Sequence, residues 1–298
     1  MAEAWILLGL GCALGTAIAD VLTKRAAAHR SHHEAMLLRT VLPVLLLLPL
    51  LPWIGWPRME PESLPWLAAA LPLEILALNL YLDAIRGGVL VQTLPFLALT
   101  PVAAVVAAYY LLGEGVAPMG AAGVLLVGSG CYFAFRMDMT YLEEAPAGKS
   151  DAGSGRGRRS RRRAMLQMAA VALIYSVTPV LAKGAMKQGN ALAFGIAYYS
   201  AVAGLSTAVI LVRNPGAWRG AVATRASDWA IGICIAAVVL MHYAALQLSA
   251  VPYFLALKRT SIVFGAIIGT LVLGQAIGKR GWLPSALVVL GAGLIVLR

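Results

Sequence analysis

The chain has 298 residues, of which 60% are hydrophobic and only 12% are charged. An average soluble domain carries roughly 25% charged residues, so this composition excludes an ordinary soluble protein and indicates a membrane protein. The formal net charge is +11, from 24 Lys and Arg against 13 Asp and Glu. A nucleic-acid-binding protein needs a solvated basic face. The sequence offers none, so we expect no nucleic-acid partner.

Runs of about 18 or more mostly apolar residues predict transmembrane helices. Ten such runs lie at residues 5–22, 35–56, 64–86, 87–113, 117–135, 164–186, 190–213, 228–250, 251–274 and 281–297. The runs 87–113 and 251–274 are long enough to tilt or to contain a break, which fits the prolines within them. Ala17-Ile18-Ala19 resembles a signal-peptidase site, but no cationic side chain precedes the first run, so an uncleaved helix is expected.

A hydrophilic segment at residues 136–163 separates the first five runs from the last five. It contains Gly153-Ser154-Gly155 followed by several arginines. Such a composition cannot bury apolar surface and predicts a flexible linker. We therefore expect a first five-helix repeat at 1–135, a basic linker at 136–163 and a second five-helix repeat at 164–298.

Short matches in the same order relate the two halves. Leu112-Gly113-Glu114 corresponds to Leu273-Gly274-Gln275, residues 125–130 correspond to residues 288–293, and Lys24 corresponds to Lys183. Because each repeat has an odd number of spans, the second copy is upside down relative to the first. Inverted repeats are typical of secondary transporters, whose substrate site lies near the midplane. The predicted fold is an all-α membrane protein with ten transmembrane helices in two inverted five-helix repeats.

The two halves and the proline-led segment from Pro101 to Leu112-Gly113-Glu114 resemble EamA-type members of the drug/metabolite transporter superfamily. The resemblance covers essentially the whole chain apart from the basic linker. It implies a transporter of small molecules, and its degenerate motifs indicate an architecture rather than a substrate. The second repeat departs from the family pattern, because Gln275 stands where the family usually has Glu.

The positive charge is distributed unevenly over the predicted loops. The loops after odd-numbered spans hold 17 of the 24 Lys and Arg, and the opposite side, which includes both termini, holds four. Because cytoplasmic loops collect Lys and Arg, this predicts a cytoplasmic linker and external termini in the inner membrane. That orientation is opposite to the one usual in the family. The other three cations, Arg39, Lys258 and Arg259, fall inside spans.

Lys258 and Arg259 are the principal candidates for substrate contact. An ionisable side chain at the bilayer centre costs on the order of 2.5–3.5 kcal/mol by insertion scales and usually faces a cavity. Adjacent cations suit an anionic ligand, because Arg offers a bidentate fork and Lys a point charge. The pair also resembles the phosphate-gripping pair of plastid triose-phosphate translocators, although Leu97 stands where those proteins have a further lysine. The alternative is an ion pair with Glu74 or Asp83.

Other polar side chains inside the spans have two interpretations each. Glu74 is either a counter-ion for the cations or a proton-coupling carboxylate, and His242 is either a proton-coupling group or a packed histidine. Asn79, Asp83 and Arg86 share one helical face. Asp20 and Lys24 are expected to form an interfacial ion pair, four residues apart. The predicted substrate-binding residues are Lys258, Arg259, Glu74, Asn79, His242, Tyr243, Tyr175 and Thr178.

Three prolines within spans, Pro95, Pro101 and Pro179, are candidate hinge or gate residues, because proline removes a backbone hydrogen bond and bends helices. Hydroxyls lie close to each of them and could instead satisfy the freed carbonyls.

The predicted function is secondary transport of a small organic anion, with a phosphorylated metabolite as one option, by alternating access. The alternatives are a flippase for a lipid-linked phosphate or sugar and an exporter of amino acids or drug-like metabolites. A membrane enzyme is disfavoured because the intramembrane carboxylates are isolated and cannot hold Mg²⁺. We expect no cofactor and no metal, a small-molecule substrate within the lipid bilayer, and a monomer or homodimer.

Overall fold

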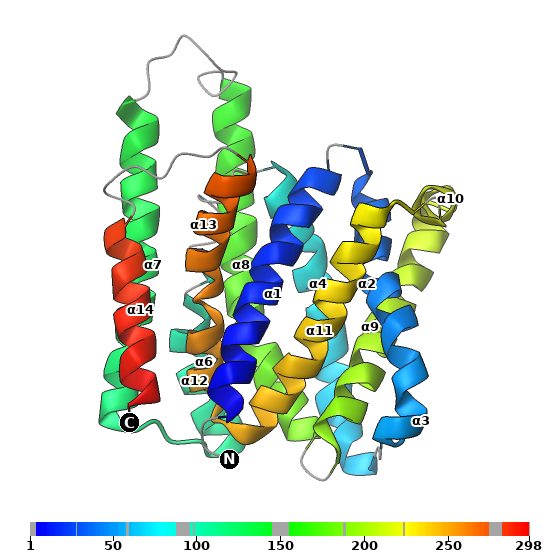
Figure 1. The fold of residues 1–298 in the computed structure, drawn as a ribbon, viewed down its shortest axis with the longest axis horizontal. Coiled ribbons are helices and arrows are strands. Elements are labelled where there is room, and N and C mark those ends of the chain that lie inside the picture. Colours follow the sequence, from blue (N-terminus) through cyan, green and yellow to red (C-terminus); the bar gives the residue numbers. More distant parts are fainter. Residues whose placement is uncertain are drawn as a thin grey trace.

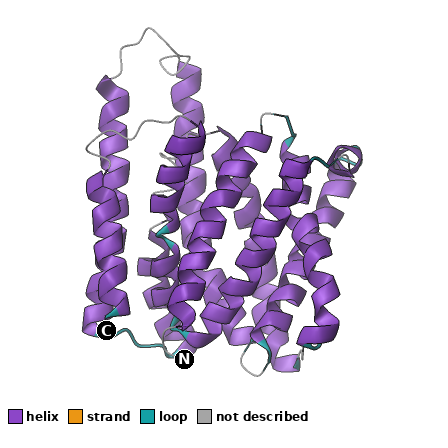
Figure 2. Cartoon of the chain, in the orientation of Figure 1, coloured by secondary structure: helices purple, strands orange, loops and turns teal. Residues whose placement is uncertain are grey.

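The structure is a computed structural model and describes residues 4–27, 29–57, 60–87, 96–97, 99–144, 155–186, 189–222, 224–273 and 282–297. Within these ranges the regular secondary structure is helical throughout (Figure 2). The helices in chain order are α1 (Ala4–Ala26), α2 (His32–Leu47), η1 (Leu48–Leu50), α3 (Leu51–Ile54), η2 (Pro61–Ser63), α4 (Leu64–Gly87), α6 (Leu99–Leu112), α7 (Pro118–Glu144), α8 (Gly155–Ala185), α9 (Ala191–Arg213), α10 (Ala217–Val222), α11 (Ala226–Leu248), α12 (Val251–Lys258), α13 (Ser261–Leu273) and α14 (Trp282–Val296).

The long helices lie roughly side by side and form one bundle (Figure 1). The start of α1 and the end of α14 lie at one end of the bundle, which we call the terminus end. The end of α7 and the start of α8 lie at the opposite end, which we call the linker end (Figure 1). Helices from the two halves of the chain interleave: α1 packs on α11, α4 on α8, α2 on α9, and α7 on α14.

Glycines allow α1 to approach α11 closely. A Cβ atom at Gly11 would lie 2.7 Å from the sulfur of Met241, and one at Gly15 would lie 2.8 Å from Val238 Cγ2. Small residues at such spacing are a common way to bring helices together in lipid. Gly11 and Gly15 therefore serve the packing of α1 on α11.

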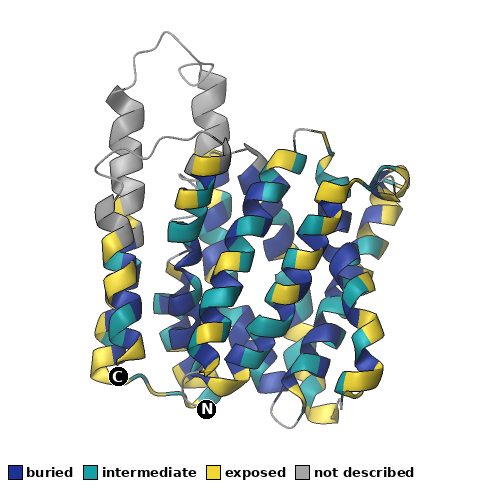
Figure 3. Ribbon diagram, viewed as in Figure 1, coloured by how far each residue is buried: buried dark blue, intermediate teal, exposed yellow. Residues whose placement is uncertain are grey.

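The outer surface of the bundle is apolar, as a membrane protein requires. Large hydrophobic side chains such as Leu7, Trp53 and Val212 are more than 70% exposed, and buried residues face the interior of the bundle (Figure 3). A soluble monomer rarely exposes so much apolar surface. The chain is therefore an integral membrane protein.

Seven of the described helices or helical segments are long and apolar enough to cross a membrane. They are Ala4–Ala26, His32–Ile54, Pro61–Ile85, Arg162–Ala185, Ala191–Arg213, Ala226–Leu248 and Val251–Gly269. Three shorter apolar helices cover Leu99–Leu112, Pro118–Gly130 and Ala286–Val296. All of these segments fall within the predicted runs to within a few residues, and ten membrane crossings remain a prediction.

The basic segment is more helical than the sequence suggested. Helix α7 continues to Glu144 and α8 already begins at Gly155, so within 136–163 only residues 145–154 lie outside the described helices. The structure thus describes helix over residues 136–144 and 155–163, and the flexibility of this segment stays a prediction. Arg is a good helix former, and extending an existing helix costs far less than nucleating a new one.

The run 251–274 was expected to tilt or to contain a break, and the structure has a break. Helix α12 ends at Lys258 and α13 begins at Ser261, so the interruption lies at Arg259 and Thr260 and not at the proline of the run. Pro252 instead occupies the first turn of α12, where a missing N–H costs no helical hydrogen bond.

Candidate substrate cavity

A cavity of about 170 Å³ lies inside the bundle, between helices of both halves. Its wall includes side chains from α1, α2, α4, α8, α9, α11 and α12. The predicted site residues that line it are Glu74, Tyr175, Thr178, Pro179, His242, Tyr243, Lys258 and Arg259. Polar residues that stand out inside different apolar runs of the sequence thus line the same cavity.

Lys258 lies at the last turn of α12, directly before the helix break. Its Nζ is 3.0 Å from Nδ1 of His242 on α11. A protonated lysine donates this hydrogen bond, so Nδ1 of His242 acts as the acceptor and the ring is neutral. The edge of the same ring also contacts Phe254, with the two ring centroids 4.9 Å apart. The hydrogen bond to the neutral ring of His242 therefore does not compensate the positive charge of Lys258.

Arg259 follows in the interruption between α12 and α13 and is 6% exposed. Its backbone has helical angles (φ −69°, ψ −10°), and its N–H bonds the carbonyls of Leu255 and Ala256. The interruption places two cations at the negative end of the α12 dipole, which stabilises positive charge. Ser261, the first residue of α13, also lines the cavity.

Glu74 lies near the middle of α4 and faces the same cavity as Thr178 of α8. The ion pairs among the described residues do not include Glu74. Among the described residues, neither Glu74 nor Asp83 forms an ion pair with Lys258 or Arg259, which was the alternative interpretation of these cations. Asp83 instead lies 3.0 Å from Nδ1 of His32.

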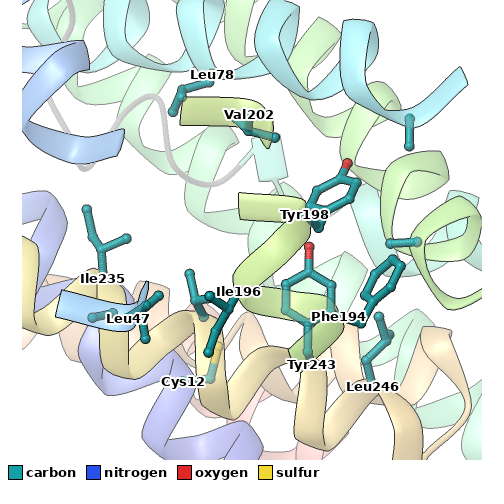
Figure 4. Packing of buried hydrophobic residues seen from close by; sticks show 14 of the residues in the cluster. Cys12, Leu47, Leu78, Phe194, Ile196, Tyr198, Val202, Ile235, Tyr243 and Leu246 are labelled. Atoms are coloured by element: carbon teal, nitrogen blue, oxygen red, sulfur yellow. The ribbon is translucent and has the colours of Figure 1, made fainter. Parts of the chain in front are cut away.

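Two aromatic residues of the cavity wall, Tyr198 and Tyr243, pack with Phe194 behind the wall. Phe194, Tyr198 and Tyr243 lie against one another with ring centroids 5.7–5.9 Å apart (Figure 4). The hydroxyl of Tyr198 is buried and has no hydrogen-bond partner among the described residues. Most buried polar atoms in proteins are hydrogen-bonded, so this hydroxyl is a candidate contact for a ligand.

The structure adds a second charged group that the sequence analysis missed. Arg39 of α2 donates from Nη1 to Oδ1 of Asp20 at 3.2 Å and to the hydroxyl of Thr23 at 2.7 Å. The hydroxyl of Tyr81 donates to the other carboxylate oxygen of Asp20 at 2.6 Å. Tyr199 donates to the main-chain carbonyl of Arg39 at 2.8 Å. Asp20, Arg39, Tyr81 and Tyr199 all line the cavity.

The expected ion pair between Asp20 and Lys24 is wrong. The carboxylate of Asp20 turns to Arg39, and Nζ of Lys24 donates to the carbonyl of Ile85 at 2.6 Å. Spacing along one helix favours such a pair, but a buried cation on the neighbouring helix competes for the same carboxylate. Arg39 was noted in the sequence as an intramembrane cation, and that was the signal that could have found it.

Asn79 does not line the cavity, although it was predicted to contact substrate. Its Oδ1 lies 3.3 Å from Nε2 of His32, and its amide donates to the carbonyl of Ile75. The physical reason is helical geometry, because residues five apart point to different faces. Asn79 and Asp83 both approach His32, which confirms their shared face. The side chain of Arg86 is outside the described residues.

The three prolines have different positions. Pro179 lies inside α8 and lines the cavity. Pro101 is buried in the first turn of α6, where proline is tolerated without the loss of a helical hydrogen bond. Pro95 lies outside the described residues.

A cluster at the terminus end joins the two halves. Nζ of Lys183 lies 2.5 Å from Oε1 of Glu114 and donates to the carbonyl of Ser249 at 2.6 Å. The other carboxylate oxygen of Glu114 accepts the N–H of Val251 at 2.9 Å, at the start of α12. Glu114, the acidic residue of the matched Leu-Gly-Glu segment, thus ties α6, α8 and the turn between α11 and α12.

Comparisons with known proteins agree with this architecture. Twenty-four chains of solved structures match, and one of them, a crystal structure, is similar over 100% of this chain and 98% of its own, with a TM-score of 0.72 and 16% identity. At this identity the likeness shows the fold alone. No curated protein matches the chain. The sequence model described as the EamA-like transporter family matches residues 3–136, which cover the first predicted repeat. Residues 3–136 therefore match the family that the resemblance predicted.

Proposed function

We propose that the protein is a secondary transporter that moves a small organic anion across the membrane by alternating access, with the central cavity as its substrate site. The observation that carries this proposal is the convergence of three cationic side chains, Arg39, Lys258 and Arg259, on one cavity inside an apolar bundle. The carboxylates of the same wall are Asp20 and Glu74. Cations therefore exceed anions by one among the described lining residues.

The size of the cavity limits the substrate. A cavity of about 170 Å³ is comparable to the engineered cavity of about 150 Å³ that accommodates benzene. The substrate is thus a small metabolite, or a larger one admitted by rearrangement. A small carboxylate or phosphate ester fits these limits.

The broken helix supports the anionic character of the substrate. Half-helix N-termini at the membrane midplane are positive dipole ends and recur as contacts for anionic groups in transporters. The N-terminus of α13 adjoins Lys258 and Arg259, and Ser261 and Ile262 line the same cavity. The positive end of the α13 dipole and the charges of Lys258 and Arg259 therefore both favour an anionic ligand.

The packing of the helices supports the two inverted repeats. The pair α1–α11 joins the first helix of one repeat to the third helix of the other, and α4–α8 is the reciprocal pair. Lys24 donates to the carbonyl of Ile85 near the end of α4, and its repeat equivalent Lys183 donates to the carbonyl of Ser249 after α11. Equivalent contacts at opposite ends are what an inverted repeat produces, and rocking of one repeat on the other gives alternating access.

A zwitterionic substrate, such as an amino acid, is the second candidate. Glu74 lines the cavity together with the cations, so it could bind an ammonium group while Lys258 and Arg259 bind a carboxylate. The same family match supports both candidates, and neither assigns a catalytic role to any residue. We further propose placement in the inner membrane with external termini.

The proposal is tested by ligand-induced thermal stabilisation of the purified protein in detergent. The panel contains sugar phosphates, small carboxylates, amino acids and amines, and the proteins are the wild type and the Lys258→Gln/Arg259→Gln variant. A ligand at 100 times its dissociation constant stabilises by about 2.7 kcal/mol, which is easily measured. We expect anions or amino acids to raise the melting temperature of the wild type alone.

The matched control is Arg213→Gln/Arg219→Gln, which removes two exposed cations away from the cavity. This variant should respond to ligands as the wild type does. Stabilisation by amines only, or an equal response of the Lys258→Gln/Arg259→Gln variant, would contradict the proposal. Stabilisation by amino acids but not by other anions would select the zwitterionic candidate.

A further inference from the structure

Asp20, Arg39 and Tyr81 form a compact buried group in the cavity wall. Asp20 is 3% exposed and Arg39 is 8% exposed. Both oxygens of the carboxylate accept hydrogen bonds, one from Arg39 and one from Tyr81, and the guanidinium also lies over the Tyr81 ring at 5.6 Å. The hydrogen bonds of the Arg39 guanidinium to described residues all leave from Nη1. Its Nε and Nη2 donors make no hydrogen bond to a described residue, and Arg39 lines the cavity.

The position of this pair distinguishes it from the other buried arginine–aspartate pair. Arg30 and Asp228 are joined at 2.7 Å, and Asp228 is 1% exposed, but neither residue lines the cavity. Asp20 and Arg39 both do. A solute in the cavity therefore lies near Arg39, whose positive charge is already paired with the carboxylate of Asp20.

We propose that Asp20 is the proton-binding carboxylate of the transporter, and that its protonation releases Arg39 to bind the anionic substrate, so that one proton and one anion travel together. This inference rests on the proposed function, because it requires an anionic substrate. The proton is taken up from the side to which the cavity is open, is held as the O–H of the Asp20 carboxylic acid, and leaves on the opposite side. Arg39 then exchanges one anionic partner for another.

Charge conservation inside the cavity is the physical reason for the coupling. A buried arginine that loses its partner is strongly destabilising, because an uncompensated charge remains in a medium of low dielectric constant. When a monovalent anion enters as Asp20 takes up a proton, the formal charge of the cavity stays the same. Proton and anion therefore favour each other's binding, and linkage makes this effect reciprocal.

The groups around Asp20 explain why this residue, rather than Glu74 or His242, is assigned the role. The charged or titratable groups that face it or lie on the helices packed on α1 are Arg39, Glu74, Tyr81, Asp83, Asp228, Cys234, His242, Tyr243, Tyr253, Lys258 and Arg259, and α1 itself carries Cys12, Lys24 and Arg25. Glu74 belongs to no ion pair among the described residues, so its protonation releases no cation. Protonation of His242 would place two cations 3.0 Å apart at Lys258. Of these three residues, Asp20 is the one whose protonation would release the guanidinium of Arg39.

The test measures binding of lactate and of sulfate by thermal stabilisation between about pH 5.5 and pH 8, a range in which both probes remain ionised and only the protein titrates. The proteins are the wild type, Asp20→Asn and the matched control Asp228→Asn. For one coupled proton, we expect the wild-type affinity to fall by up to about tenfold per pH unit at the alkaline end. Asp20→Asn should bind with an affinity independent of pH, and Asp228→Asn should follow the wild type.

A second measurement needs no variant to fold. Infrared difference spectra of the wild type report the carbonyl band of a protonated carboxyl group, and addition of lactate or sulfate should increase that band at a fixed pH. A carbonyl band that is unaffected by both anions overturns the inference.

The outcomes separate this inference from the proposed function. Binding of either anion that is independent of pH in the wild type overturns the role of Asp20 and leaves anion transport standing. A pH dependence that persists in Asp20→Asn does the same. If neither anion binds any protein at any pH or changes the carbonyl band, anion recognition by this cavity fails and the inference fails with it.

Discussion

At the scale of single residues, the hydroxyl of Tyr198 is the sharpest indication of where a substrate sits. It is buried beside Phe194 and Tyr243 and has no hydrogen-bond partner among the described residues (Figure 4). Leaving a buried hydroxyl unsatisfied costs about 1–3 kcal/mol, so a ligand that bonds to it gains affinity. The hydroxyl of Tyr253, by contrast, has a hydrogen-bond partner, because it accepts the N–H of Ala117 at 2.7 Å.

These two tyrosines give a matched pair of variants. Tyr198→Phe should leave the melting temperature of the ligand-free protein unchanged or slightly raised and should weaken binding of the stabilising ligand about tenfold. Tyr253→Phe should lower the stability by about 1–2 kcal/mol, because the N–H of Ala117 loses its acceptor, and should leave affinity unchanged. Both effects are measured by thermal shift with and without ligand. A destabilised Tyr198→Phe protein with normal affinity would show that this hydroxyl has a structural partner instead.

The sequence predicted part of the site because intramembrane polarity is a local property. Lys258, Arg259, Glu74 and His242 stand out in apolar runs, and all of them line the cavity. The link between Asp20 and Arg39 could not be predicted in this way, because it depends on which helices become neighbours. Asn79 is also polar and inside a span, but its side chain lies beside His32 and is not part of the cavity wall.

At the scale of helices, the close contact of α7 with α14 depends on glycine. A Cβ atom at Gly123 would lie 2.7 Å from the carbonyl oxygen of Gly291 and 2.7 Å from Cγ1 of Ile295. The oxygen belongs to the main chain and cannot rotate away, so the helices would have to separate. Gly293, on the same α14, has no atom within 4 Å of a Cβ atom built on it.

We therefore expect Gly123→Ala to destabilise the protein by about 1–3 kcal/mol, the usual cost of overpacking. Gly293→Ala should be neutral or stabilising by up to about 1 kcal/mol, because alanine is the better helix former. Thermal unfolding in detergent compares the two. Equal stability of both variants would show that α7 and α14 do not approach as closely as described.

Helix positions were predictable and helix interruptions were only partly so. The apolar segments of the described helices fall within the predicted runs to within a few residues, because the length of an apolar run can be read from the sequence. The run that contains Arg259 and Thr260 was expected to tilt or to break, and its proline does not mark the position of the break. At the break, the N–H and the hydroxyl of Thr260 both donate to the carbonyl of Leu257, at 3.0 and 2.8 Å.

At the scale of the whole molecule, the termini lie at one end of the bundle, and the end of α7 and the arginine-rich start of α8 lie at the other (Figure 1). The distribution of Lys and Arg predicts that the linker end is cytoplasmic. We expect a cysteine at Glu62, an exposed residue between α3 and α4, to react with a membrane-impermeant maleimide in intact cells. A cysteine at Ser150 in the linker should react only after the membrane is opened.

The wild type, with its own Cys12, Cys131 and Cys234, gives the background labelling. Labelling of Ser150→Cys but not Glu62→Cys in intact cells would reverse the orientation. The proposed cavity and its charges would be unaffected by that result, because the site lies inside the bundle and not at either end.

The central claim is that the cavity around Lys258 and Arg259 carries a small organic anion across the membrane. Its most direct test is counterflow uptake of the radiolabelled panel anion that most stabilises the protein, in proteoliposomes preloaded with the same unlabelled anion. We predict rapid uptake by the wild type and by Arg213→Gln/Arg219→Gln, and a loss of uptake in Lys258→Gln/Arg259→Gln that retains its fold. Uptake by the last variant equal to that of the wild type would contradict the account.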